Sequence, residues 1–187
     1  STLSSSSAAS DVYKRQVKDN PQSIRMGTVS GTLPQLAALA IQKKEDVAFK
    51  MTDLGVNNKA TELMSGRIDA YIDGVGQLSQ YVKSGDFRLL MAFAKDDTVI
   101  PGFEDLPSAE SLGYTDFDYL LQSFGVWMPK GTDEKIVQYY ADLIKTCSED
   151  PECIKELNAL GYGARSEDPE NYANICEKVQ TKTNEAV

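Results

Sequence analysis

The sequence predicts an α/β fold in which a mainly parallel sheet is flanked by helices. From Ser23 onward, short apolar segments alternate with segments of helical periodicity. The apolar segments are nearly continuous, which is typical of parallel strands covered on both faces. With 187 residues, 41% hydrophobic and 25% charged, the composition is that of a globular protein with one large domain or one and a half small ones.

The first half of the chain repeats a strand and helix pattern. The expected strands are residues 24–28, 47–51, 68–73 and 87–94. The expected helices between them are residues 33–43, 57–65 and 77–84. Gly66 and Gly85 follow two of these helices, in the position where glycine commonly ends a helix.

The second half begins with an irregular crossing and ends with helices. We expect irregular chain over residues 95–106, a short helix over 107–112 and a long strand over 119–128. The three helices expected after it are residues 133–147, 151–160 and 170–183. Pro151 and Gly161 bracket the second of them, because proline suits the first position of a helix and glycine the position past its end.

The turn between the first strand and the first helix is a candidate anion site. Thr32 and Gln35 match a Thr-x-x-Gln capping box, and Pro34 lies in the first turn of the helix. A helix N-terminus has unpaired amides and a partial positive charge, so it holds a carboxylate or phosphate without a charged side chain. The alternative is an ordinary strand-to-helix turn.

Six segments resemble, in order, the substrate-binding proteins of tripartite tricarboxylate transporters, also called the Bug family. They read IRMGTVSGT (24–32), VAFK (47–50), LMSGRID (63–69), VKSGDFRLLMA (82–92), LPSAESLGY (106–114) and FGVWMPKGT (124–132). One departure concerns the second segment, where Met51, Thr52 and Asp53 replace the family's glycine.

The resemblance implies a type II periplasmic-binding-protein-like fold, which has two lobes with the ligand between them. Residues 17–121 are then the second ligand-binding lobe, and 122–187 are the crossover and C-terminal helices of the first lobe. The rest of the first lobe has no counterpart here, so we expect the chain to be a fragment. Residues 1–16 are low in complexity and are expected to be a non-native or disordered leader.

The function implied by the resemblance is extracytoplasmic solute capture for a tripartite tricarboxylate-type secondary transporter. The expected location is periplasmic or extracytoplasmic, and the expected partners are a small carboxylate ligand and the membrane transporter subunits. The expected ligand-binding residues are Thr28, Val29, Ser30, Gly31, Thr32, Leu33, Asp73, Gly74 and Ser123. A regulator's effector-binding domain with the same lobe architecture is the alternative.

Two of these residues have their own local argument. Asp73 and Gly74 follow a predicted strand, at the edge of a parallel sheet where ligands bind. Asp73 is either a hydrogen-bond acceptor for a ligand or a cap for the next helix. Asp69 lies on the same face of the strand, but no nucleophile or metal motif accompanies the pair, so we do not expect an enzyme.

Composition argues against other classes of function. The chain contains no histidine, which excludes a Ser-His-Asp triad and removes the commonest zinc ligand, and we expect no cofactor or metal. A net charge of −9 disfavours nucleic acid, and no apolar run reaches the roughly 18 residues of a membrane span. Cys147 and Cys153 either form a disulfide with each other or remain thiols together with Cys176.

Overall fold

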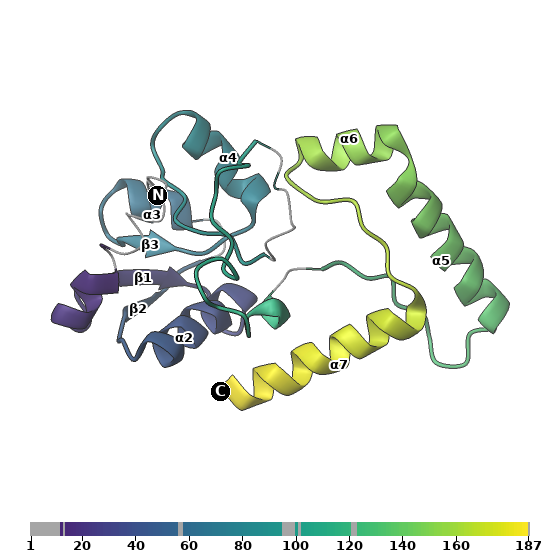
Figure 1. The fold of residues 1–187 in the computed structure, drawn as a ribbon, viewed down its shortest axis with the longest axis horizontal. Helices are drawn as coiled ribbons and strands as arrows, with labels where there is room; N and C mark the ends of the chain where they lie inside the picture. The colour runs from purple at the N-terminus through teal and green to yellow at the C-terminus, as the bar shows by residue number, and fades with distance from the viewer. Residues whose placement is uncertain are drawn as a thin grey trace.

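The computed structural model describes residues 12, 14–55, 58–94, 100, 102–120 and 123–186. A small sheet with helices around it forms one part of the molecule, and two helices, α5 and α6, stand apart from it (Figure 1). The last helix, α7, runs back and contacts α2 of the sheet part (Figure 1). The C-terminal residues therefore belong to both parts.

The sheet has three parallel strands in the order β2-β1-β3. The strands are β1 (Arg25–Thr28), β2 (Lys50–Asp53) and β3 (Ala70–Tyr71). Central strand β1 is buried from Met26 onward, and Met26 faces Met51 on one side and Ala70 on the other. The predicted α/β class with a parallel sheet is confirmed.

Three helices connect and cover the strands, namely α2 (Leu33–Glu45), α3 (Lys59–Met64) and α4 (Val75–Lys83). The core lies where α2 packs against the segment that ends in the short 3-10 helix η1 (Asp118–Leu120). Its buried members are Leu36, Ala37, Ala40, Ala109, Tyr114, Phe117, Tyr119 and Leu120. Burial of these apolar side chains is the main force that holds α2 against the sheet part.

The C-terminal helices are α5 (Glu134–Glu149), α6 (Pro151–Ala159) and α7 (Pro169–Ala186). Aspartates cap all three, because Asp133, Asp150 and Asp168 each accept a hydrogen bond from a backbone amide of the first turn. The helical prediction for this region is confirmed, with bounds that differ by at most three residues.

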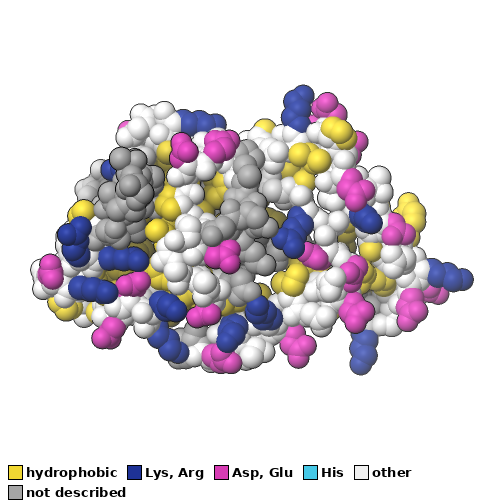
Figure 2. All heavy atoms as spheres, viewed as in Figure 1, with side chains coloured by type: hydrophobic (Ala, Val, Ile, Leu, Met, Phe, Trp, Pro, Cys, Tyr) yellow, Lys and Arg dark blue, Asp and Glu magenta, His cyan; other side chains and the backbone are white. Residues whose placement is uncertain are grey.

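Much of the apolar surface of this C-terminal part is exposed. Neither α5 nor α6 has a buried residue, and Figure 2 shows apolar side chains at the surface there. The exposed large apolar residues are Phe124, Val126, Trp127, Ile136, Tyr139, Tyr140, Leu143, Ile144, Leu160, Tyr162 and Ile175. In the part of the chain that the structure describes, no helix combines the length and apolar composition needed to cross a membrane.

Three sequence predictions are wrong. Residues 87–94 form no strand, and only Ala92 makes an isolated parallel bridge, with Ser108. Residues 107–112 form turns instead of a helix. In place of a strand over 119–128, η1 is followed by irregular chain over 123–128, while 121 and 122 lie outside the described residues.

The errors share a physical cause. An apolar run predicts burial, and burial does not require a strand, since residues 87–94 are partly buried without pairing in the sheet. The strand predicted over 47–51 begins three residues later, and the one over 68–73 is reduced to Ala70–Tyr71.

Residues 14–19 are helical, so this helix begins inside the segment 1–16 that the sequence sets apart as a leader. Val17 is buried, and Lys14 pairs with Glu45 at 3.2 Å. The Lys14 ammonium also lies over the Tyr114 ring, 4.6 Å from its centroid. This helix is thus attached to the C-terminal end of α2 through Glu45. The assignment of residues 1–16 as a leader stays a prediction.

Candidate ligand-binding cavity

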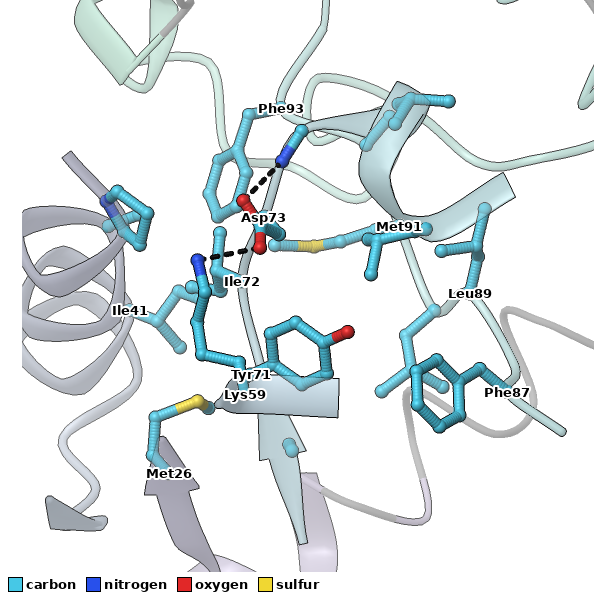
Figure 3. Close-up of a pocket in the computed structure, with 18 of the residues that line it drawn as sticks. Met26, Ile41, Lys59, Tyr71, Ile72, Asp73, Phe87, Leu89, Met91 and Phe93 are labelled. Atoms are coloured by element: carbon cyan, nitrogen blue, oxygen red, sulfur yellow. Dashed lines mark hydrogen bonds and ion pairs between the residues drawn. The ribbon is translucent and has the colours of Figure 1, made fainter. Parts of the chain in front are cut away.

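A cavity of about 1280 Å³ is lined by residues from both ends of the sheet: Val29 and Asp73 follow β1 and β3, whereas Ile24 and Phe49 precede β1 and β2. Its wall comprises the β1–α2 turn, the start of α4, residues 86–94 and the turn that follows α6. Most of its lining is apolar, and Figure 3 shows Ile41, Leu89, Met91 and Phe93 among the side chains that surround it. The part of the cavity around Val29 and Asp73 lies at the carboxyl edge of the parallel sheet, where ligands bind in such folds.

The β1–α2 turn already holds a carboxylate of the protein itself. The backbone N–H of Ser30 donates to Asp53 Oδ1 at 3.0 Å, and the Ser30 hydroxyl donates to Oδ2 at 2.8 Å. The Ser30 side chain, then its backbone N–H, hold the pKa of the Asp53 carboxyl below its usual range. The turn is therefore able to stabilise an anion, and Asp53 stays ionised at neutral pH.

The predicted capping box is not formed. Thr32 occupies the N-cap position, but its hydroxyl donates to the Val29 carbonyl at 2.6 Å and makes no cap hydrogen bond. Gln35 does reach back, yet its Oε1 accepts from the Gly31 N–H at 2.8 Å instead of from Thr32. Gly31 has a φ of +73°, a left-handed conformation that glycine adopts without strain.

Among the described residues, two amides at the start of α2 are unpaired, and that of Leu33 belongs to a residue of the cavity wall. The Leu33 and Gln35 N–H groups have no hydrogen-bond partner within the part of the chain that the structure describes. Leu33 lines the cavity, together with Val29 and Thr32. A helix N-terminus with unpaired amides therefore lies at the cavity wall.

An ion pair lies inside the cavity. Lys59, from α3, places its Nζ 2.6 Å from Oδ2 of Asp73, and the exposed fractions of the two side chains are 10% and 21% (Figure 3). Asp73 Oδ1 accepts the N–H of Gly74 at 2.9 Å, so the carboxylate is held from both sides. Lys59 has two further N–H donors, which gives this wall of the cavity a cation with spare hydrogen-bonding capacity.

Aromatic side chains form a second wall. The ring centroids of Tyr71 and Phe87 are 6.0 Å apart in an edge-to-face arrangement, and Phe87 stacks on Tyr81 at 4.6 Å. Burial, then the charge of Asp73 and the neighbouring Tyr81, raise the pKa of Tyr71 to about 12. The Tyr71 hydroxyl is therefore neutral at physiological pH and supplies no charge.

The structure brings five of the nine predicted site residues to the cavity wall. These are Val29, Thr32, Leu33, Asp73 and Gly74. The other four do not line it. Thr28 is buried in β1, Ser30 and Gly31 lie in the turn with their amides engaged, and Ser123 is exposed on the irregular chain after η1.

Lys59 is the polar residue that the sequence prediction missed. It lies 14 positions from Asp73, a spacing that matches no motif, and a lysine at the start of a helix is usually solvated. One weak indication of its role was present in the sequence, namely that Lys59 lies near the start of a helix expected to pack on the sheet.

The C-terminal part reaches the cavity through a contact between two glycines. Gly161 has a φ of +79°, and a Cβ built on it would lie 2.7 Å from the backbone N of Gly76. A Cβ on Gly76 would in turn meet the Leu160 carbonyl oxygen. The start of α4 and the turn after α6 are thus in direct backbone contact, and Gly161 lines the cavity.

The described residues form neither a metal-binding cluster nor a reactive thiol site. In these ranges, no three side chains of Cys, Asp or Glu gather as a metal-binding group. The three cysteines are present as free thiols. Burial, followed by the charges of Cys147 and Asp150, raises the pKa of Cys153 above its ordinary value, which disfavours a reactive thiolate at that position.

Comparison with known proteins identifies the family. Residues 6–186 match the family described as "Tripartite tricarboxylate transporter family receptor". The chain belongs to this family. The Bug-family resemblance seen in the sequence is therefore confirmed, and the matched family is one of receptors.

Two relatives show how much of a family member the chain spans. Protein BugT of Bordetella pertussis is 26% identical over 129 residues, which are 68% of this chain and 39% of BugT. The UPF0065 protein in the tcbD-tcbE intergenic region of Pseudomonas sp. (strain P51) is 25% identical over 164 residues, 86% of this chain and 48% of that protein. The chain thus spans less than half the length of either.

Solved structures confirm the fold. An R. palustris protein with adipate matches with a TM-score of 0.75 and 18% identity, over 99% of this chain and 61% of that one. MatC from Rhodopseudomonas palustris with bound malate matches with a TM-score of 0.68 and 16% identity, over 94% and 60%. Periplasmic binding protein BugD matches with a TM-score of 0.66 and 19% identity, over 93% and 59%. The expected type II periplasmic-binding-protein-like fold is confirmed.

Proposed function

We propose that this chain is part of an extracytoplasmic solute-binding protein that captures a small carboxylate for a tripartite tricarboxylate-type secondary transporter. One observation carries the proposal, namely a cavity whose polar groups at the carboxyl end of β1 and β3 include an unpaired amide of a helix N-terminus and a largely buried lysine. Both kinds of group favour an anion.

The proposed contacts divide between the two ends of the cavity wall. The Leu33 N–H donates to one carboxylate oxygen of the ligand, with Gln35 as a second donor. Lys59 keeps its ion pair with Asp73 and donates a further N–H to the ligand, directly or through water. Asp73 accepts a hydrogen bond from a ligand hydroxyl where one is present.

Two further facts support a carboxylate. The Ser30 and Asp53 pair shows that the same turn accommodates a carboxylate at hydrogen-bonding distance. The two solved structures with adipate and malate belong to proteins that share the fold of this chain, and both ligands are carboxylates. Neither feature favours an enzyme or a regulator's effector-binding domain.

We infer that ligand capture depends on closure between the two parts of the fold. The glycine contact between α4 and the turn after α6 is one place where the two parts meet, and α7 against α2 is another. Such interfaces are typical hinges or closure points. The closed form then presents the ligand to the membrane subunits of the transporter, and the protein acts in the periplasm or its equivalent.

An NMR titration of the 187-residue chain tests the proposal. Adipate and malate are added to ¹⁵N-labelled protein, with adipamide as a neutral control of matched shape. We expect saturable shifts in residues of the cavity wall with the carboxylates only. Because NMR detects millimolar affinity, weak binding is still measured. Equal shifts with adipamide, or none with either carboxylate, would contradict carboxylate capture.

A further inference from the structure

The cavity contains little positive charge with which to balance a polyanion. Among the described residues that line it, Lys14, Lys59 and Arg88 are cationic. The anionic residues of the described lining are Glu45, Asp69, Asp73 and Asp86. The lining thus has no excess of cations, and a ligand with three carboxylates would bring more negative charge than its basic side chains could compensate.

The cations are also engaged already. Lys14 pairs with Glu45 at 3.2 Å, and Lys59 pairs with Asp73 at 2.6 Å. Two of the acids also have cation partners outside the lining: Arg25 Nη2 lies 2.6 Å from Asp69 Oδ1, and Lys18 Nζ lies 3.3 Å from Glu45 Oε2. The Lys59 and Asp73 pair has no net charge, so it accommodates one additional carboxylate through hydrogen bonds and offers little to a second.

The rest of the lining is apolar over a large space. Figure 3 shows Met26, Ile72, Leu89, Met91 and Phe93 around the ion pair. The volume of about 1280 Å³ exceeds the usual range of roughly 300–1,000 Å³ for small-molecule pockets. A molecule of the size of malate would leave most of this apolar surface in contact with water, whereas a ligand with an apolar body would cover it.

We propose that the preferred ligand is a monocarboxylate with an apolar body, either an aliphatic chain of six or more carbons or an aromatic ring. This inference rests on the proposed function and narrows its substrate class. The carboxylate lies at the α2 N-terminus and Lys59, and the body lies against Tyr71, Phe87 and Leu89. Polycarboxylates such as citrate bind more weakly.

The test is an NMR titration of the 187-residue chain with a chain-length series of butanoate, hexanoate and octanoate. Each added CH₂ is expected to tighten binding by roughly fourfold, the value for a methylene transferred from water to an apolar cavity. Phenylacetate represents the aromatic class, phenylacetamide is its neutral control, and citrate and malate represent the polar class.

Two variants show where the body binds. Leu89→Glu introduces a charge into the cavity wall and is expected to remove the gain with chain length. Leu143→Ser removes apolar surface from exposed α5 and is expected to leave the series unchanged. Loss of octanoate binding in Leu143→Ser alone would overturn the proposal, since the fatty chain would then bind the exposed helices.

The two proposals fail in different ways. If citrate or malate binds more tightly than octanoate and phenylacetate, the apolar monocarboxylate is wrong and carboxylate capture stands. If no carboxylate in the panel produces saturable shifts, carboxylate capture fails and the narrower proposal fails with it. Equal affinity for phenylacetate and phenylacetamide would also overturn both.

Discussion

Lys59 Nζ lies 2.6 Å from Asp73 Oδ2 inside an apolar cavity, and the two residues come from different elements, α3 and the turn before α4. A largely buried pair of this kind is costly to break, because the remaining partner keeps its charge and loses its compensation. The pair therefore has two roles: it stabilises the packing of α3 against the end of β3, and it belongs to the proposed binding site.

The first prediction separates these two roles. Lys59→Met should lower the free energy of unfolding by about 1–3 kcal/mol, because it leaves Asp73 without its partner, and should also abolish carboxylate binding. The double variant Lys59→Met with Asp73→Leu should regain much of the stability without regaining binding. Urea denaturation and ligand titration measure the two effects.

A matched control is Lys155→Met, because Lys155 belongs to an exposed pair with Glu152 on α6. It should change stability by no more than about 0.5 kcal/mol and leave affinity unaltered. If the double Lys59 and Asp73 variant binds carboxylate as well as the unsubstituted chain, Lys59 is a structural residue only.

The second prediction concerns Asp53, which occupies the Ser30 amide and hydroxyl in the anion turn. Asp53→Asn removes a negative charge from the β1–α2 turn, which also contains the unpaired Leu33 amide of the proposed site. Affinity for a carboxylate should therefore rise by roughly threefold to tenfold, the size of a screened interaction over a few ångströms. Asp142→Asn removes the same charge from exposed α5 and should have no effect. Weaker binding in Asp53→Asn would show that Asp53 supports the site.

The third prediction concerns the backbone contact between α4 and the turn after α6. Gly76→Ala places a methyl group against the Leu160 carbonyl, so the two segments must separate, and the unfolding free energy should fall by about 1–3 kcal/mol. Gly163→Ala is the matched control, since a Cβ there meets no atom within 4 Å. Thermal melts and amide exchange of α6 measure both, and equal behaviour of the two variants would refute the contact.

The fourth prediction is a dependence of stability on acid. Hydrogen bonds from the Arg25 guanidinium, at 2.6 and 2.9 Å, hold the pKa of Asp69 below its usual range despite partial burial. In the unfolded chain Asp69 has its ordinary pKa of about 4, so the contribution of the pair is complete above that value. It is lost as the pH falls through the lower folded pKa.

Asp69→Asn should therefore be less stable than the unsubstituted chain at neutral pH and should approach it in stability as the pH falls toward 2. Urea midpoints measured at several pH values give this comparison. Parallel curves for the two proteins over the whole range would show that the Arg25 and Asp69 pair contributes nothing to folding.

How far the sequence predicts this fold depends on the kind of element. The helices after Asp133 follow from the helical spacing of their apolar residues and from Pro151 and Gly161 at the two ends of one of them, because both signals are local. Strand β1 follows from a short apolar run before a glycine-containing turn. These predictions needed no knowledge of distant contacts.

The remainder depended on tertiary placement. Residues 87–94 have a strand's composition, but they lie over the cavity with one bridge at Ala92, and only the packing of the whole chain decides this. Lys59 lies beside Asp73 because α3 packs against β3. The number of residues between the two does not indicate this contact. The Thr32 hydroxyl donates to the Val29 carbonyl, a contact that depends on the backbone conformation of the turn and not on the Thr-x-x-Gln spacing.

The central claim, that the free amides at the start of α2 hold a ligand carboxylate, is tested most directly by the ¹H and ¹⁵N shifts of Leu33 and Gln35 during titration with hexanoate. We predict saturable downfield shifts of both amide protons, with the same dissociation constant as the Lys59 signals, and unchanged behaviour in an Arg67→Ala control. Shifts that omit Leu33 and Gln35, or that vanish in Arg67→Ala, would contradict it.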